Sequence, residues 1–174
     1  MNRASTTNYA FIDAQNLNLG IRELGWDLDF KRFRVYLKEK YHVSKAYLFI
    51  GYVPENTSLY KSLQEFGYTL MFKPILKNKE GIVKGNIDAD LVVQAMIDFP
   101  NYDKAIIATS DGDFYSLVEY LYKQNKLAFV LSPNRAKCSI LLKKSAREKI
   151  NFLDNLRKKL GYKRKDTAKG RNPR

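Results

Sequence analysis

The sequence is poor in the residues that build disulfides and zinc sites. Among its 174 residues there is one cysteine, Cys138, and one histidine, His42. One cysteine cannot form an internal disulfide, and this scarcity fits a reducing compartment, so the cytoplasm is the expected location. Zinc sites in proteins are built mainly from Cys and His side chains, so a Cys/His zinc site is not expected either.

Long apolar runs are also missing. No stretch approaches the roughly 20 apolar residues that span a bilayer. No apolar signal-peptide core precedes the first strand-like run, so neither export nor a membrane partner is expected. Apolar residues nevertheless make up 45% of the chain and aromatic residues 13%, which is enough for the packed core of one domain.

Acidic residues are in the minority, with 18 Asp and Glu against 31 Lys and Arg and a net charge of +13. Such an excess commonly indicates a polyanionic partner. Residues 157–174 hold nine of the basic side chains and one acid, and the last stretch, 161–174, lacks apolar periodicity. We therefore predict a folded domain over 1–156 and a disordered basic tail over 157–174. The tail could serve solubility or bind nucleic acid, and the sequence leaves both open.

Short apolar runs alternate with segments of helical spacing. The apolar runs predict strands at 9–13, 45–53, 68–75, 104–109 and 127–131. Helices are predicted at 17–24, 29–41, 56–67, 87–99, 113–125 and 136–146, with a short strand or helix within 150–160. The polar, lysine-rich segment 76–86 is expected to be a mobile loop. This alternation predicts the α/β class, as a three-layer α/β/α sandwich with a doubly wound, mostly parallel sheet.

Five aspartates stand where predicted strands end or helices begin: Asp13, Asp88, Asp90, Asp111 and Asp113. Taken singly, each is explained by helix capping, which is worth about 1 kcal/mol. In a doubly wound sheet, however, the carboxyl ends of the strands share one edge, so acids from distant segments are expected to converge. Converging carboxylates raise one another's pKa and cost stability. A divalent cation removes that cost, and oxygen ligands without His or Cys favour Mg²⁺ or Mn²⁺.

Three of these segments resemble, in order and spacing, the motifs of NYN domains in the PIN-like nuclease superfamily. They are "FIDAQNL" at 11–17, "KGNIDADLV" at 84–92 and "TSDGDFYSLVEYL" at 109–121. The LabA-like proteins are the most similar group, and the resemblance covers roughly Tyr9 to Leu156. It implies a PIN-like sandwich and a ribonuclease that depends on Mg²⁺ or Mn²⁺.

The resemblance also assigns roles to individual residues. Asp13, Asp88 and Asp111 match the metal-binding acids, Asp113 matches a fourth, outer carboxylate, and Asn16 matches an amide that places water or substrate. Local capping is an equally good explanation of Asn16. In addition, Lys84 and Gly85 match a "KG" pair that precedes the second acid. Position 94 is Gln where several relatives have Asp, and Asp90 could supply that charge.

Several residues are candidates for binding nucleic acid, although each could also be ordinary surface. The candidates are Lys84, Ser110, Arg135, Lys137, Lys143 and Lys144. Basic side chains supply most of the non-specific affinity for a phosphate backbone. Tyr52 and Tyr115 could stack on unpaired bases, whereas Phe114 is expected in the core.

The first hypothesis is therefore a metal-dependent ribonuclease that hydrolyses single-stranded RNA with a metal-activated water. The alternative is an RNA-binding or regulatory module of little turnover on the same fold. A phosphatase of the haloacid-dehalogenase type ranks last, because that chemistry needs a second acid where this chain has Gln15. RNA is the expected partner, and the sequence leaves open whether the chain forms a homodimer.

Overall fold

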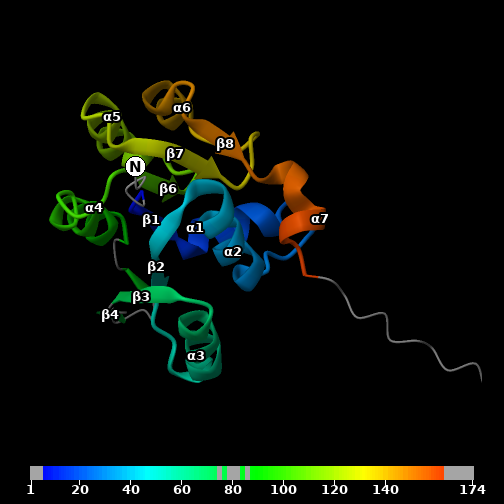
Figure 1. The fold of residues 1–174 in the computed structure, drawn as a ribbon. Coiled ribbons are helices and arrows are strands. Elements are labelled where there is room, and N and C mark those ends of the chain that lie inside the picture. The colour runs from blue at the N-terminus through cyan, green and yellow to red at the C-terminus, as the bar shows by residue number, and fades with distance from the viewer. Residues whose placement is uncertain (1–5, 74–75, 78–82, 85–86, 163–174) are drawn as a thin grey trace, which may run out of the picture.

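Six parallel strands form the central sheet, in the order β3-β2-β1-β6-β7-β8 (Figure 1). The computed structural model describes residues 6–73, 76–77, 83–84 and 87–162. The strands of the sheet are β1 Asn8–Asp13, β2 Val43–Gly51, β3 Tyr68–Lys73, β6 Ala105–Ala108, β7 Leu127–Ser132 and β8 Ile150–Phe152. A separate antiparallel pair joins β4 Leu76–Lys77 to β5 Val83–Lys84.

Helices cover both faces of this sheet. They are α1 Ala14–Arg22, α2 Phe30–Tyr41, α3 Thr57–Glu65, α4 Ile87–Ile97, α5 Tyr115–Lys123, α6 Ile140–Ala146 and α7 Arg157–Leu160. One hydrophobic core packs α1, α2 and α3 against one face, and a second packs α4, α5 and α6 against the other. The predicted three-layer α/β/α sandwich is therefore confirmed, and the main sheet is parallel throughout.

Continuous apolar runs form the inner strands because both faces of the sheet are covered. All four residues of β6, "AIIA", are fully buried. Along β1, Ala10 and Ile12 face the core on the α1 side, whereas Phe11 faces the α4 side. This alternation determines the face of the sheet to which the side chain of the next residue, Asp13, points.

The strand order reverses between β1 and β6, so the chain winds outward from this pair in both directions. Such a switch point leaves a crevice beyond the carboxyl ends of the two strands, where ligands of open α/β sheets bind. The fold thus places Asp13 and the loop after β6 at one location, as predicted from the sequence.

Two parts of the chain differ from expectation. The domain boundary predicted after residue 156 placed 157–160 in the basic tail, but these residues form α7, with Leu160 buried, inside the segment 150–160 where a short strand or helix was also predicted. The backbone of Asp29 donates to the Leu160 carbonyl at 2.8 Å, which ties α7 to the start of α2. In the segment predicted as a mobile loop, β4 and β5 pair, while 78–82 and 85–86 lie outside the described residues, as does the tail from 163 to 174.

None of the helices among the described residues combines the length and the apolar character that crossing a bilayer requires.

Candidate metal centre

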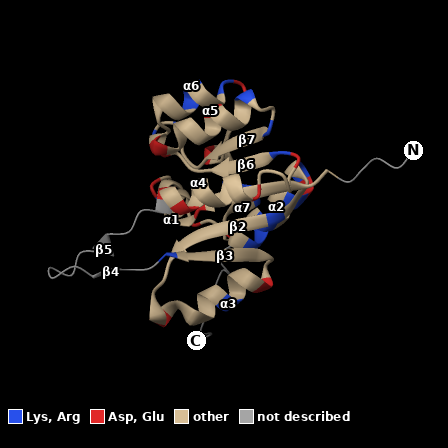
Figure 2. Cartoon of the chain, turned by 90° about the vertical axis from the view of Figure 1, so that its left-hand side faces the viewer, with Lys and Arg blue, Asp and Glu red and all other residues tan. Residues whose placement is uncertain are grey.

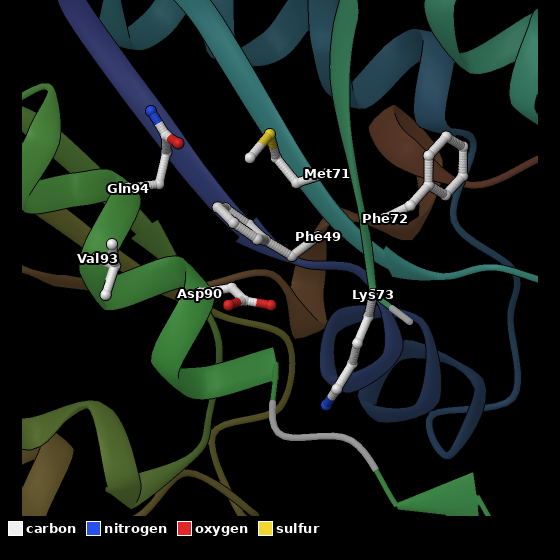
Figure 3. Close-up of a pocket in the computed structure, with 7 residues that line it drawn as sticks. All are labelled: Phe49, Met71, Phe72, Lys73, Asp90, Val93 and Gln94. Carbon is white, nitrogen blue, oxygen red and sulfur yellow. The ribbon is translucent and has the colours of Figure 1, made fainter. Parts of the chain in front are cut away.

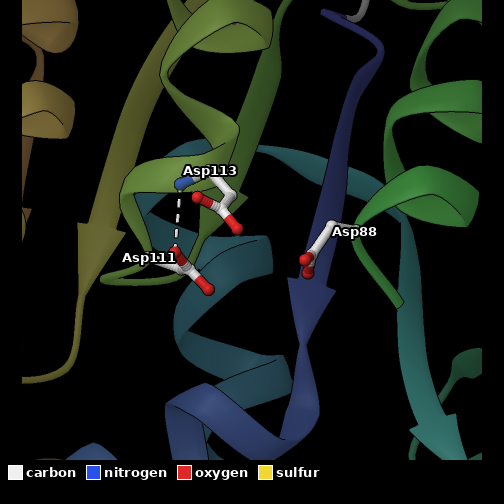
Figure 4. A group of neighbouring side chains, drawn as sticks. All are labelled: Asp88, Asp111 and Asp113. Carbon is white, nitrogen blue, oxygen red and sulfur yellow. Dashed lines mark hydrogen bonds between the residues drawn. The ribbon is translucent and has the colours of Figure 1, made fainter. Parts of the chain in front are cut away.

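Three aspartates from two distant segments meet beyond the carboxyl ends of β1 and β6 (Figure 4). Asp88 lies in the first turn of α4, and Asp111 and Asp113 flank the first residue of the short helix Gly112–Phe114. One carboxylate oxygen from each lies within 4.8 Å of the others. Three of the four acids predicted as metal ligands are therefore close enough to share one cation.

Asp13 is the fourth acid, and it lies deeper. Its side chain is 6% exposed, and its Oδ1 accepts from the backbone N–H of Asn16 at 3.1 Å, which makes Asp13 the N-cap of α1. Burial, together with the charges of Asp88 and Asp111, raises the pKa of Asp13 to about 6. Asp13 is outside the group of three whose oxygens lie mutually within 4.8 Å, yet its charge is coupled to two of them. Asp13 therefore caps α1 and also adds its charge to the acidic site.

The acids destabilise one another's charged forms. Burial and the nearby charges of Asp111 and Asp113 raise the pKa of Asp88, and Lys73 opposes this rise. Lys73 is the last residue of β3, and no feature of the sequence pointed to it. A site of converging oxygen donors with too little positive charge fits a hard divalent cation, because the cation would remove the repulsion. The residues present therefore fit Mg²⁺ or Mn²⁺.

The loop that carries Asp111 is held by its own hydrogen bonds. The buried Thr109 hydroxyl accepts from the Asp111 backbone N–H at 3.2 Å, and Asp111 Oδ1 accepts from the Asp113 N–H at 3.0 Å. Between the two acids, a Cβ added to Gly112 would lie 2.5 Å from Oγ of Ser139. A glycine therefore separates the acids because the start of α6 packs directly against this turn.

Asn16 connects the first turn of α1 to the same loop. Its Oδ1 accepts from both the backbone N–H and the hydroxyl of Ser110, each at 2.8 Å. The sequence suggested either a local cap or a water-placing amide for Asn16, and this bridge across 94 positions was not foreseen. The hydroxyl of Ser110, a predicted RNA contact, is likewise engaged with Asn16.

Replacing Asn16 by alanine is expected to lower the free energy of unfolding by about 1–3 kcal/mol, because a partly buried backbone N–H loses its acceptor. The measurement is urea denaturation of the full chain. Asn18→Ala on the same helix is the matched control and should change stability by less than about 0.5 kcal/mol. Equal losses in both variants would show that the bridge to Ser110 contributes nothing specific.

The predicted basic candidates lie on the segment between β7 and α6 and on α6 itself. The guanidinium of Arg135 lies 4.1 Å from the ring centroid of Phe152, and Nζ of Lys143 donates to the Arg135 carbonyl at 3.0 Å. Lys137 and Lys144 are exposed. In Figure 2, acidic positions lie around α1 and α4, whereas basic positions lie on α6 and at the end of β3.

The other residues singled out in the sequence differ in exposure and in position. Phe114 is fully buried, as predicted, while Tyr115 is 43% exposed. Asp90 is exposed and lines a pocket between β3 and α4 together with Lys73 and Gln94, so it is not one of the three clustered acids (Figure 3). The side chain of Lys84 and the whole of Gly85 lie outside what the structure describes.

Comparison with known proteins agrees with this picture. The family model of the NYN domain matches residues 9–153. Among solved structures, a protein of unknown function, VPA0982 from Vibrio parahaemolyticus RIMD 2210633, superposes with a TM-score of 0.73 at 23% identity, over 89% of this chain and 98% of that one. This likeness concerns the fold alone. No curated protein matches the sequence. Because the family model spans most of the chain, including every clustered acid, this protein belongs to the NYN domain family of the PIN-like nuclease superfamily.

Proposed function

We propose that this protein is a LabA-like ribonuclease of the cytoplasm that hydrolyses phosphodiester bonds in single-stranded RNA and depends on Mg²⁺ or Mn²⁺. The observation that carries the proposal is the group formed by Asp88, Asp111 and Asp113 at the switch point of the sheet, with Asp13 beneath it. A protein that only bound a polyanion would gain nothing from these acids, since they repel phosphate and one another.

The proposed cation would be held by Asp88, Asp111 and Asp113, with Asp13 contributing charge from below. When bound, such a cation lowers the pKa of a water and offsets the negative charge that develops on the phosphate. Asp113 is exposed, whereas Asp13 is buried, so RNA would approach from the side of Asp113.

The basic residues would bind the RNA backbone on both sides of the acids. Arg135 and Lys137 belong to the segment between β7 and α6, and Lys143 and Lys144 belong to α6 itself. This helix begins next to Gly112, and Lys143 and Lys144 lie in its last turn. Lys73 stands on the opposite side, where its charge is coupled to Asp88. Contacts of this kind position a phosphate backbone without reading its sequence.

Cleavage of a labelled single-stranded RNA by the full chain tests the proposal. We expect cleavage with Mg²⁺ or Mn²⁺, complete loss in excess EDTA, and recovery when the cation is restored. RNA binding without cleavage under either cation would instead favour the non-catalytic module. Cleavage that persists in EDTA would rule out the metal-dependent mechanism.

A further inference from the structure

Three aromatic rings, from the residue after β2, from α3 and from the end of β3, form a cluster outside both hydrophobic cores. The ring of Tyr52 stacks on that of Tyr60 at a centroid distance of 5.8 Å, and Phe72 packs edge-on to both rings, at 5.4 Å and 4.8 Å. Tyr60 is buried, whereas Tyr52 is 46% and Phe72 44% exposed. The cluster thus has one buried ring as its base and two rings open to solvent.

Hydrogen bonds on either side of Tyr52 hold the exposed ring in place. The hydroxyl of Tyr60 accepts from the backbone N–H of Val53 at 2.7 Å and donates to the Gly51 carbonyl at 3.1 Å. The chain is therefore fixed immediately before and after Tyr52. An aromatic surface that is already ordered binds a flat ligand at a lower entropic cost than a mobile one does.

The cluster lies at the same edge of the sheet as the acids. In the parallel register, Asp13 pairs with Phe49 on β2, and the next residue, Ile50, pairs with Phe72 on β3. Neighbouring strands are about 4.8 Å apart, so Phe72 stands about 10 Å across the sheet from the strand that carries Asp13. The Phe72 ring itself packs on Tyr60 of α3, so a short stretch of extended nucleic acid chain would cross the edge of the sheet to reach both the rings and the acids.

Lys73 connects the two features. It follows Phe72 directly, and its charge acts on Asp88, as the effect on the pKa of that acid shows. Figure 3 shows the two side chains leaving the end of β3 in different directions, with the ring of Phe72 pointing away from α4 and Lys73 extending toward the start of α4. Lys73, which could bind a phosphate, and Phe72, which could stack on a base, are thus adjacent in the sequence.

We infer that Tyr52 and Phe72 form a stacking platform for unpaired bases of the RNA next to the cleaved bond. This inference rests on the proposed function, to which it adds a binding surface for the bases of the single strand. Aromatic side chains bind single strands by stacking on bases of any sequence. Bases in a duplex are already stacked on one another, so the platform would select unpaired RNA over paired RNA. The overall charge of +13 complements such a polyanion.

Equilibrium binding of a labelled single-stranded RNA, followed by fluorescence anisotropy in EDTA, tests the platform in the full chain carrying Asp111→Asn. In that background, Tyr52→Ala and Phe72→Ala are each expected to weaken binding about 5-fold or more. Tyr52→Phe and Phe72→Tyr keep a ring and should bind as the parent does. Tyr120→Ala is the matched control, since Tyr120 is 41% exposed on α5 and packs on Phe99.

Two further measurements separate stacking from charge. An abasic oligonucleotide of the same length should bind the parent and the two alanine variants equally. The slope of affinity against salt should also be unchanged in these variants, because they remove no phosphate contact. Equal RNA affinity in the parent and both alanine variants would overturn the platform. So would a change of oligomeric state with unchanged RNA affinity, since the rings would then bind a second copy.

The inference and the proposed function can fail separately. If the protein cleaves RNA with a metal but both alanine variants bind and cleave normally, the platform is wrong and the nuclease stands. If the alanine variants lose single-strand binding while no cation supports cleavage, the platform stands on a protein that only binds RNA.

Discussion

Replacing Asp111 by asparagine is expected to lower the rate of RNA cleavage by about 100- to 1,000-fold. Losses of this size follow when one group that stabilises developing charge is removed from an active site. In the wild type, Asp111 Oδ1 accepts a hydrogen bond from the Asp113 N–H at 3.0 Å. The side-chain oxygen of asparagine can accept the same hydrogen bond. The turn is thus retained and only the charge is lost. Single-turnover cleavage of a labelled RNA in Mg²⁺ measures the effect.

Asp90→Asn is the matched control for this experiment. Asp90 is an exposed acid two positions from Asp88 in the first turn of the same helix, yet it lies outside the group of three. Its replacement removes the same charge from the same surface and should change the rate less than about 3-fold, because exposed charges interact weakly through water. A similar loss in Asp90→Asn and Asp111→Asn would mean that net surface charge, rather than a shared metal site, governs cleavage.

The fold could be predicted because its strands carry a strong local pattern. Continuous apolar runs such as "AIIA" in β6 are typical of strands buried on both faces, and intervening helices imply parallel pairing. A short element within 150–160 was predicted, but the residue at which the domain ends was not. Residues 157–160 read "RKKL", so the one leucine that is buried follows three basic residues and forms no apolar pattern in the sequence. The contact that orders them joins Leu160 to Asp29, far away in the sequence.

The site was predictable as far as topology determines it. Parallel strands that leave the switch point bring the residues after β1 and β6 to one place, so Asp13 and Asp111 had to be neighbours. Which side chains complete the site depends on distances that topology leaves open. Lys73 reaches Asp88 only because β3 ends where α4 begins, and Asn16 reaches Ser110 only because α1 starts beside the loop after β6.

The bridge from Asn16 also helps to fix the loop that carries two of the three clustered acids. Hydrogen bonds within the loop, rather than attraction between the acids, fix Asp111 and Asp113 in position. The backbone N–H of Ser139 donates to the Ser110 carbonyl at 3.1 Å and holds the loop from its other side. Rigid contacts thus hold repelling charges in place, and the repulsion is a cost to the stability of the whole domain.

Asp13→Asn is expected to stabilise the metal-free protein by about 3 kcal/mol at pH 7 while it abolishes cleavage. The folded-state pKa of Asp13 is about 6, whereas an unperturbed Asp titrates near 3.8. Between these values the folded state binds more protons than the unfolded state, so the free energy of unfolding of the wild type falls as pH rises from about 4 to 6. The shift of about two units corresponds to about 3 kcal/mol. Urea denaturation in EDTA at several pH values should show the gain at pH 7 and its disappearance below about pH 4.

Asp29→Asn is the control that separates this effect from capping. Asp29 caps α2 as Asp13 caps α1, with an oxygen that accepts from the N–H three residues on at 3.1 Å in both cases. Asp29, however, pairs with Arg32 at 3.6 Å, so its replacement should leave stability unchanged or lower it by up to about 1 kcal/mol. A cation at 100 times its Kd would return about 2.7 kcal/mol to the wild type and little to Asp13→Asn, so the gap between them should narrow in Mg²⁺ or Mn²⁺. If the difference in free energy of unfolding between the wild type and Asp13→Asn changed with neither pH nor metal, Asp13 would carry no charge that its neighbours repel. The acids would then be caps that happen to lie close together, with no cation to share.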